Sequence, residues 1–324
     1  MSEVKPAKSY LDIVNECDSF PSIQDDPQDY KRYVSNFYAF KINGYSDILG
    51  YMPNEQVVKF LWPNSTWKVV QGKAGESGTL TLMSPEDATA DERTALLDET
   101  LQAARNTFEV LKGWRNELYP IYIPGTTKLL ASIERSAACL FGLPTWGIHL
   151  TAFIKKDGKF LIWVPRRSAT KSTFSGMLDN SVAGGMATGE TPFECMLREA
   201  EEEASLERDV AKHAIAVGAL SYIYERDHRA GGETGLLQPE CEYVYDLPLS
   251  PEIILKPKDG EVEMFNLMSV EEVIAEVRQG SFKPNCAVVI IDFLIRHGYI
   301  TAENEKYYEE ICSRLHRRLG YPNI

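Results

Sequence analysis

The segment Gly184–Leu206 constrains the fold of this 324-residue chain most, because it joins a glycine-rich turn to a helix with a well-defined start. Thr191 is a favourable N-cap residue, Pro192 suits the first helical turn, and Glu194 completes a capping box. The helix is expected to run to about Ala204. The sequence therefore predicts a turn that leads directly into a short helix.

This helix carries an acidic face near its C-terminal end. Glu199, Glu202 and Glu203 are three and four residues apart, so their carboxylates share one side. Like charges at this spacing repel one another, and the negative end of the helix dipole adds to the cost. A divalent cation held by oxygen ligands would offset the repulsion. The alternative is a solvated acidic face without a ligand.

The flanking residues predict two domains. Before residue 141, strands are expected at 67–70 and 79–83, and a helix should begin at the capping box of Thr89 and Glu92 and end at Gly113. We assign residues 1–141 to a smaller α+β N-terminal domain.

Residues 142–324 are expected to form the second domain, an α/β/α sandwich, because strands and helices are mixed without a regular βαβ repeat. Its helices are expected after Thr191, after the Ser269 capping box, from Pro284 to Gly298, and at 307–319. Its strands are expected at 147–154, 159–164, 214–225, 240–247 and 261–267.

The acidic balance restricts the partners. The formal net charge is −13, whereas nucleic acids and anionic membranes attract basic surfaces. The N-terminal residues lack the apolar segment of a signal peptide, and the longest apolar run, 287–291, is too short to cross a bilayer. Six scattered cysteines without a CxxC pair indicate reduced thiols. We expect a cytoplasmic protein that binds neither nucleic acid nor membrane.

The spacing around the acidic helix resembles the signature of the Nudix hydrolases, a family of mixed-sheet α/β/α sandwiches. Ser205 stands where the family has a glycine, and Ala200 fills an apolar position. The charged positions that follow Gly184 all match the signature: Glu190, Arg198, Glu199, Glu202 and Glu203.

Further fragments look like the Nudix subgroup related to thiamine pyrophosphokinase, whose members carry an extra N-terminal domain. They lie at 114–119, 133–135, 141–142 with 149–150, and 178–185. Some members are fused to the kinase, but no kinase is expected here because the two domains account for the chain. The N-terminal domain is expected to shape the substrate pocket or a dimer interface, and a homodimer fits its amphipathic tyrosines.

The resemblance implies the residues of the site. Glu199, Glu202 and Glu203 would bind Mg²⁺, with Mn²⁺ as a substitute, and one of them would help to deprotonate the attacking water. The carbonyl of Gly184 and a carboxylate from a later strand, Glu242 or Glu240, would add ligands. Arg198 and Glu190 would form an internal ion pair that holds the turn and the helix rigid.

Residues outside the signature have two interpretations each. Arg166, Arg167 and Lys171 either grip a terminal phosphate or are ordinary exposed basic residues. Trp163 and Phe174 either stack on a heteroaromatic ring or belong to the core. We interpret His149 as a hydrogen-bonded structural residue rather than a catalytic base.

The implied reaction is metal-dependent hydrolysis of a P–O–P linkage in a small diphosphate. The subgroup favours thiamine diphosphate, or its oxidised or otherwise damaged analogues, cleaved to the monophosphate. The nearest alternative is hydrolysis of nucleoside diphosphate derivatives, including oxidised nucleotides. An isopentenyl-diphosphate isomerase would need a cysteine and a glutamate acting on carbon, and Cys139 and Cys195 lack that context. A non-catalytic binding module would not need the three glutamates.

Overall fold

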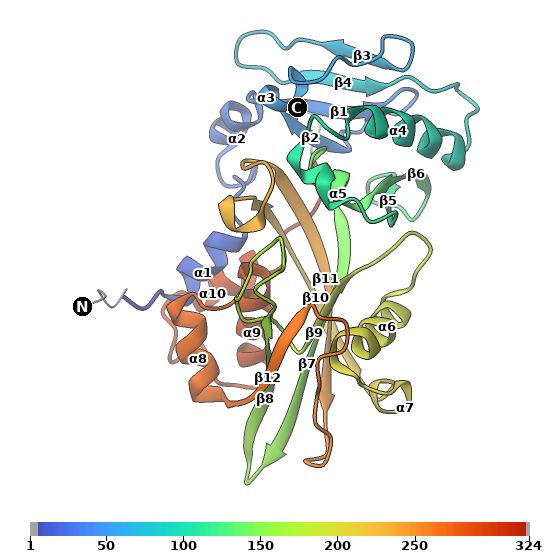
Figure 1. Cartoon of the computed structure of the whole chain (residues 1–324). Coiled ribbons are helices and arrows are strands. Elements are labelled where there is room, and N and C mark those ends of the chain that lie inside the picture. The colour runs from blue at the N-terminus through green and yellow to red at the C-terminus, as the bar shows by residue number, and fades with distance from the viewer. Residues whose placement is uncertain (1–5, 322–324) are drawn as a thin grey trace.

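The computed structural model describes residues 6–321, which form two sheets, a two-stranded hairpin and the helices around them (Figure 1). The N-terminal sheet has the order β2-β1-β4-β3, and helix α4 (Ala90–Ala104) lies beside it. Its strands are β1 (Phe37–Ile42), β2 (Gly50–Pro53), β3 (Trp67–Val70) and β4 (Gly78–Leu82). Short helices α2 (Pro27–Val34) and α3 (Asn54–Val57) flank these strands.

The helix predicted to end at Gly113 is shorter than the sequence suggested. The Thr89–Glu92 capping box is present, but α4 ends at Ala104, and a separate 3₁₀ turn, η1, spans Glu109–Gly113. A distant carboxylate holds the start of this turn: Glu233 accepts hydrogen bonds from the backbone N–H groups of residues 109 and 110, at 2.7 and 2.9 Å. These bonds start a new turn with its own cap.

The second sheet has the order β10-β11-β7-β8-β12, with β9 paired to β7. It is mixed, because β7 is parallel to β11 and antiparallel to β8. Its strands are β7 (Thr145–Lys156), β8 (Lys159–Arg167), β9 (Val182–Gly185), β10 (Ile215–Glu225), β11 (Leu237–Pro248) and β12 (Val262–Ser269). All five predicted strand regions are therefore present.

Helices cover both faces of this sheet (Figure 1). Along β7, Ile148, Leu150 and Ala152 pack toward α6 (Pro192–Ala204) and α7 (Arg208–Ala211), whereas Phe153 packs toward α9 (Pro284–Arg296). The same face as α9 is covered by α8 (Val270–Gln279) and α10 (Tyr308–Arg314). The predicted α/β/α sandwich is confirmed, and the helices on both faces explain why residues 147–154 of β7 are all buried.

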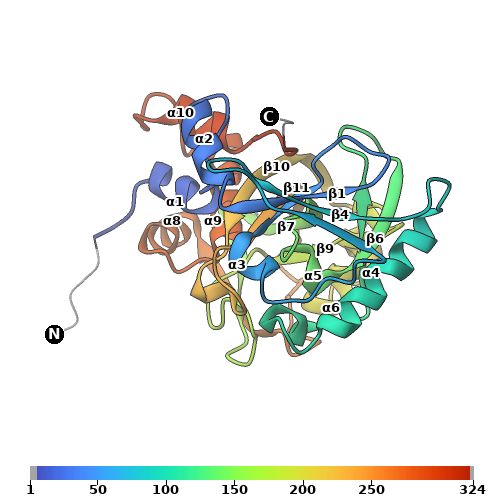
Figure 2. The same ribbon diagram turned by 90° about the horizontal axis from the view of Figure 1, so that it is seen from above.

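Both ends of the chain cross the predicted division at residues 141 and 142. Ile13, Val14 and Cys17 of α1 (Tyr10–Cys17) lie in the core formed with α9, inside the second domain. Near the C-terminus, Tyr321 packs against Tyr51 of the N-terminal sheet. Figure 2 shows this N-terminal sheet lying across the second sheet when the molecule is viewed from above. The division itself stays a prediction.

A hairpin and a strand exchange position the site. The hairpin of β5 (Leu118–Tyr122) and β6 (Leu129–Glu134) leads into α5 (Arg135–Ala138). On one edge of β7, β8 pairs only from Phe153 onward, and β9 pairs with residues 147–150 in its place. This exchange brings the glycine-rich turn beside the N-terminal hairpin. Within residues 6–321, no helix is long and apolar enough to cross a membrane.

Candidate active site

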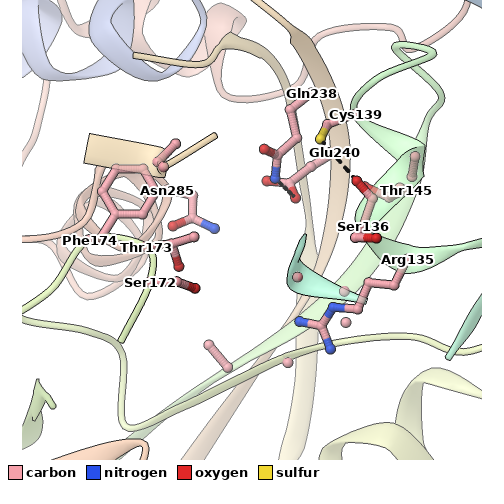
Figure 3. Close-up of a pocket in the computed structure, with 18 of the residues that line it drawn as sticks. Arg135, Ser136, Cys139, Thr145, Ser172, Thr173, Phe174, Gln238, Glu240 and Asn285 are labelled. Carbon is pink, nitrogen blue, oxygen red and sulfur yellow. Dashed lines mark hydrogen bonds between the residues drawn. The ribbon is translucent and has the colours of Figure 1, made fainter. Parts of the chain in front are cut away.

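A cavity of about 470 Å³ opens between the N-terminal domain and the second sheet, and both domains line it. Figure 3 shows Arg135, Cys139 and Thr145 on one side of this cavity and Phe174 and Asn285 on the other. Gln238 and Glu240 from β11 lie between these two sides. The cavity is therefore shared between the domains rather than contained in one of them.

The turn and the helix are held together by one arginine. Arg198 donates to both carboxylate oxygens of Glu190, at 2.9 and 3.1 Å, so the predicted internal ion pair is present. The same guanidinium also bonds Glu199 at 2.8 Å and Glu202 at 3.1 Å. At the helix start, Thr191 accepts from the backbone of Glu194, but the carboxylate of Glu194 pairs with Arg208 instead of closing the predicted capping box.

Two glycines are required by the approach of carboxylates. A Cβ on Gly184 would lie 2.0 Å from the carboxyl group of Glu199, and a Cβ on Gly147 would lie 2.3 Å from Oε2 of Glu242. Burial raises the pKa of Glu199 to about 7, against the opposing attraction of Arg198 and Arg135. The backbone of β9 therefore lies directly against a buried carboxyl group that resists ionisation.

Glu203 lies in a second carboxylate group that the sequence did not reveal. Its Oε2 accepts from the backbone N–H of Ala183 at 3.0 Å. Carboxylate oxygens of Glu203, Asp259 and Glu261 come within 4.8 Å of one another. Burial, together with repulsion from Glu199 and Asp179, raises the pKa of Glu203 well above its usual range.

The predicted triad of glutamates does not converge as a unit. Among the described residues, only the Glu203 group above meets a mutual distance of 4.8 Å. Glu202 is half-exposed, with 51% of its side chain accessible, because it turns toward Arg198. Glu199 is bonded by the same guanidinium. The helix therefore presents Glu203 to the segment before β12, while Arg198 holds the other two.

The donor set fits a hard divalent cation. Glu199, Glu203, Asp259, Glu261 and the Gly184 carbonyl offer only oxygen atoms, and burial raises the pKa values of Glu199 and Glu203. Mg²⁺ and Mn²⁺ prefer such ligands. The roles of these residues as metal ligands stay a prediction.

Glu240 and Glu242 lie on β11, deeper in the cavity. The hydroxyl of Tyr222 donates to both carboxylates. Burial alone would raise the pKa of Glu242, but the attraction of His149, whose Nε2 lies 3.6 Å from Oε1, lowers it. Nδ1 of His149 contacts Asn180 at 2.6 Å. His149 is thus buried with a polar partner at each ring nitrogen, which is the structural role that we predicted.

The three predicted phosphate-binding cations separate along the chain. Arg166 does not line the cavity: it donates to the carbonyl of Gly176 at 2.8 Å, because successive side chains of β8 point to opposite faces. Its predicted role is therefore wrong. Arg167 and Lys171 do line the cavity, where they pair with Asp179 and Glu261.

Trp163 belongs to the core between the sheet and α6, which was one of the two interpretations given for it. Phe174 instead lines the cavity. Further cations in the cavity were missed, among them Arg135 from α5 and Lys283 just before α9. The sequence around Lys283 gave no indication that this residue would line a site. Arg135 lay in a fragment that resembled the subgroup but carried no assigned role.

Comparisons with protein families divide the chain into two matched regions. A model of the NUDIX domain matches residues 147–286. A model described as a domain of unknown function, DUF4743, matches residues 28–145. Together they cover both walls of the cavity.

Curated relatives align with both regions. An uncharacterised protein of Saccharomyces cerevisiae is 44% identical over 72% of this chain and 70% of its own length. Nudix hydrolase 20, chloroplastic, of Arabidopsis thaliana is 38% identical over 74% of this chain, which spans 60% of the plant protein. A solved protein of Deinococcus radiodurans is 22% identical, covers 54% of this chain and 98% of its own, and has a TM-score of 0.39.

Proposed function

The chain belongs to the Nudix hydrolase family, and on that premise we propose that it hydrolyses thiamine diphosphate, or its oxidised or otherwise damaged analogues, to the monophosphate. The observation that carries the diphosphate class is the shared cavity. Glu203 and Glu261 face it from one side, and Arg135, Arg167 and Lys283 contribute positive charge to the same space. Carboxylates suit metal ions, and the cations suit phosphate oxygens.

Each residue has a separate task in the proposed reaction. Mg²⁺, with Mn²⁺ as a substitute, would neutralise charge on the phosphate oxygens and activate water when held by Glu199, Glu203 and the Gly184 carbonyl. Arg198 keeps the turn and α6 in a fixed relation through Glu190. Glu199, buried against the backbone of Gly184, is the carboxyl group of α6 that we assign to help deprotonate the attacking water.

The thiamine part of the proposal rests on the subgroup resemblance, above all on the fragment 178–185. In the structure this fragment provides Asp179, which pairs with Arg167 in the cavity, and Asn180, which contacts His149. It thus supports the cavity wall on the side that faces the substrate. The cytoplasmic location and the homodimer stay predictions.

A product assay tests the proposal. The purified chain is incubated with Mg²⁺ and a panel of thiamine diphosphate, oxidised thiamine diphosphates and nucleoside diphosphate sugars, and the phosphate products are separated by chromatography. We expect kcat/KM to be highest for the damaged thiamine forms. Comparable values for nucleoside diphosphate sugars would contradict the thiamine assignment and favour the nucleoside diphosphate alternative.

A further inference from the structure

The N-terminal domain contacts the glycine-rich turn at atomic range. A Cβ placed on Gly185 would lie 1.7 Å from the hydroxyl oxygen of Tyr119, which comes from β5. Only a glycine admits the ring at this place, so the hairpin and the turn are fitted to each other. Thr188, two residues before Glu190, also donates through its hydroxyl to the backbone carbonyl of Leu118 at 3.1 Å.

Arg135 projects from the same hairpin into the cavity (Figure 3). Its Nη1 donates to Glu117 at 2.9 Å, and its guanidinium lies 5.5 Å from the centre of the Tyr119 ring. Within residues 6–321, no other hydrogen bond engages its remaining N–H groups. One side of the guanidinium is thus anchored, and the other donors are available to a ligand.

Two other arginines that line the cavity, Arg167 and Arg226, already bind protein groups, although Nε of Arg226 has no hydrogen-bond partner within residues 6–321. Arg167 bonds Asp179 at 2.5 Å and the carbonyl of Thr173. Arg226 bonds Gln238 and two backbone carbonyls. An anion that binds Arg167 or the Nη atoms of Arg226 would have to displace these partners, whereas it would displace none from the free edge of Arg135.

Arg135 also stands near the acidic helix. Its positive charge opposes the burial that raises the pKa of Glu199, and it helps to lower the pKa of Glu261. A phosphate group that reaches the carboxylates of α6 therefore comes within the field of Arg135. The planar guanidinium offers paired donors that match the oxygen atoms of a phosphate.

We propose that the N-terminal domain completes the active site, and that Arg135 binds the diphosphate of the substrate. The inference rests on the proposed diphosphatase class, but it does not depend on thiamine as the organic part. This proposal assigns substrate binding to the region 28–145, which matches a domain of unknown function.

Binding of inorganic diphosphate tests the proposal without turnover. The full chain is titrated in EDTA by calorimetry, and kcat and KM are measured separately with Mg²⁺ and the best substrate of the panel. For Arg135→Gln we expect diphosphate affinity to fall and KM to rise about 10- to 100-fold, the effect of losing charged hydrogen bonds. The diphosphate affinity of Arg135→Lys should lie between those of the wild type and Arg135→Gln, because lysine keeps the charge but loses the paired donors.

Two control variants separate binding from a structural role. Glu117→Gln removes the anchor of Arg135, and it should leave diphosphate affinity within about fivefold, since a partly exposed ion pair contributes little. Arg105→Gln removes an exposed arginine of the same domain, which lies over Trp114, and should leave affinity unchanged.

The outcomes distinguish the two proposals. If Arg105→Gln lowers affinity as much as Arg135→Gln, or if Arg135→Gln binds diphosphate like the wild type, Arg135 does not bind phosphate. If Arg135→Gln loses affinity while damaged thiamine forms are not preferred, only the thiamine assignment fails. A wild-type chain that neither binds nor hydrolyses any diphosphate overturns both.

Discussion

Two neighbouring glutamates of α6 show how strongly the surroundings of a residue decide its use. Glu202 turns outward to Arg198, while Glu203 accepts from the backbone of β9 and faces Asp259 and Glu261. The sequence assigned both to the metal, because helical spacing places them on one side. Of these two residues, only Glu203 belongs to a group of three carboxylates whose oxygens lie within 4.8 Å of one another in the described structure.

Glu203→Gln should therefore separate stability from activity. Removing one charge from the acidic group should raise the metal-free stability by about 0.3–1 kcal/mol. We expect kcat to fall about 100-fold or more and the stabilisation by Mg²⁺ to be largely lost. Melting curves in EDTA and in Mg²⁺, beside the product assay, measure both effects.

Glu201→Gln is the matched control, because Glu201 lies on the same helix but is exposed and pairs with Lys258. It should retain wild-type turnover and the same response to Mg²⁺. If Glu203→Gln behaves like this control, the metal is bound elsewhere.

The buried pair of Asp179 and Arg167 predicts a pH dependence. Burial alone would raise the pKa of Asp179, but Arg167 at 2.5 Å and Lys283 lower it well below its usual range. The pair thus stabilises the fold when the pH is above about 3.9, the pKa of an aspartate in the unfolded chain. This stabilisation is lost progressively as the pH falls below that value toward the lower pKa of folded Asp179. The free energy of unfolding, compared between wild type and Asp179→Asn, should differ by a constant amount from pH 5 to 7. The difference should shrink below pH 4, and a difference that persists unchanged at pH 3 would argue against the pair.

At the scale of elements, α6 ends in a strained cap. Ser205 adopts the left-handed conformation, with φ of 52°, at the position where the family signature has a glycine. Its hydroxyl donates to the carbonyl of Lys256 at 3.0 Å and offsets part of the strain. The end of the helix is thereby tied to the segment that carries Asp259 and Glu261.

Paired variants measure this strain. Ser205→Gly and Ser205→Ala both lose the hydroxyl, but only glycine adopts positive φ without cost. We expect the glycine variant to be about 1 kcal/mol more stable than the alanine variant by denaturant unfolding. Equal stability would mean that the cap is not strained.

The elements that the sequence predicted correctly depend on local chemistry. The capping boxes at Thr89 and Ser269 use a side chain and a backbone amide only three residues away, so the pattern contains the whole interaction. The separate turn η1, which follows the early end of α4, is capped by Glu233, more than 120 residues distant. No local pattern reports such a contact.

The same distinction applies to the candidate site. The Arg198–Glu190 pair joins one turn to one helix, and the resemblance to the family signature predicted it. Glu261 and Lys283 line the cavity only because the segment before β12 and the start of α9 are brought together in the completed fold. Arg135 arrives from the other domain, so its position depends on how the two domains meet.

At the scale of the whole molecule, the two domains share their packing. Helix α1 lies at the N-terminal end of the chain, yet Ile13 and Val14 are buried against α9. Asp18 accepts from the backbone of Ile223 and from Arg317 in the C-terminal segment. The second domain is therefore incomplete without residues that precede the N-terminal sheet.

Ile13→Ala tests whether the domains unfold together. Ile13 is only 4% exposed, so its truncation should cost about 2–4 kcal/mol through lost burial and the cavity left behind. Because α1 packs on α9, we expect the melting temperature of the second domain to fall in calorimetry as one transition. The fall should be seen both without and with Mg²⁺. Ile254→Ala is the control, since Ile254 is 61% exposed and should change stability by less than about 0.5 kcal/mol. If Ile13→Ala only releases the N-terminal helix and leaves the main transition in place, α1 is an appendage, and the shared core does not couple the two domains.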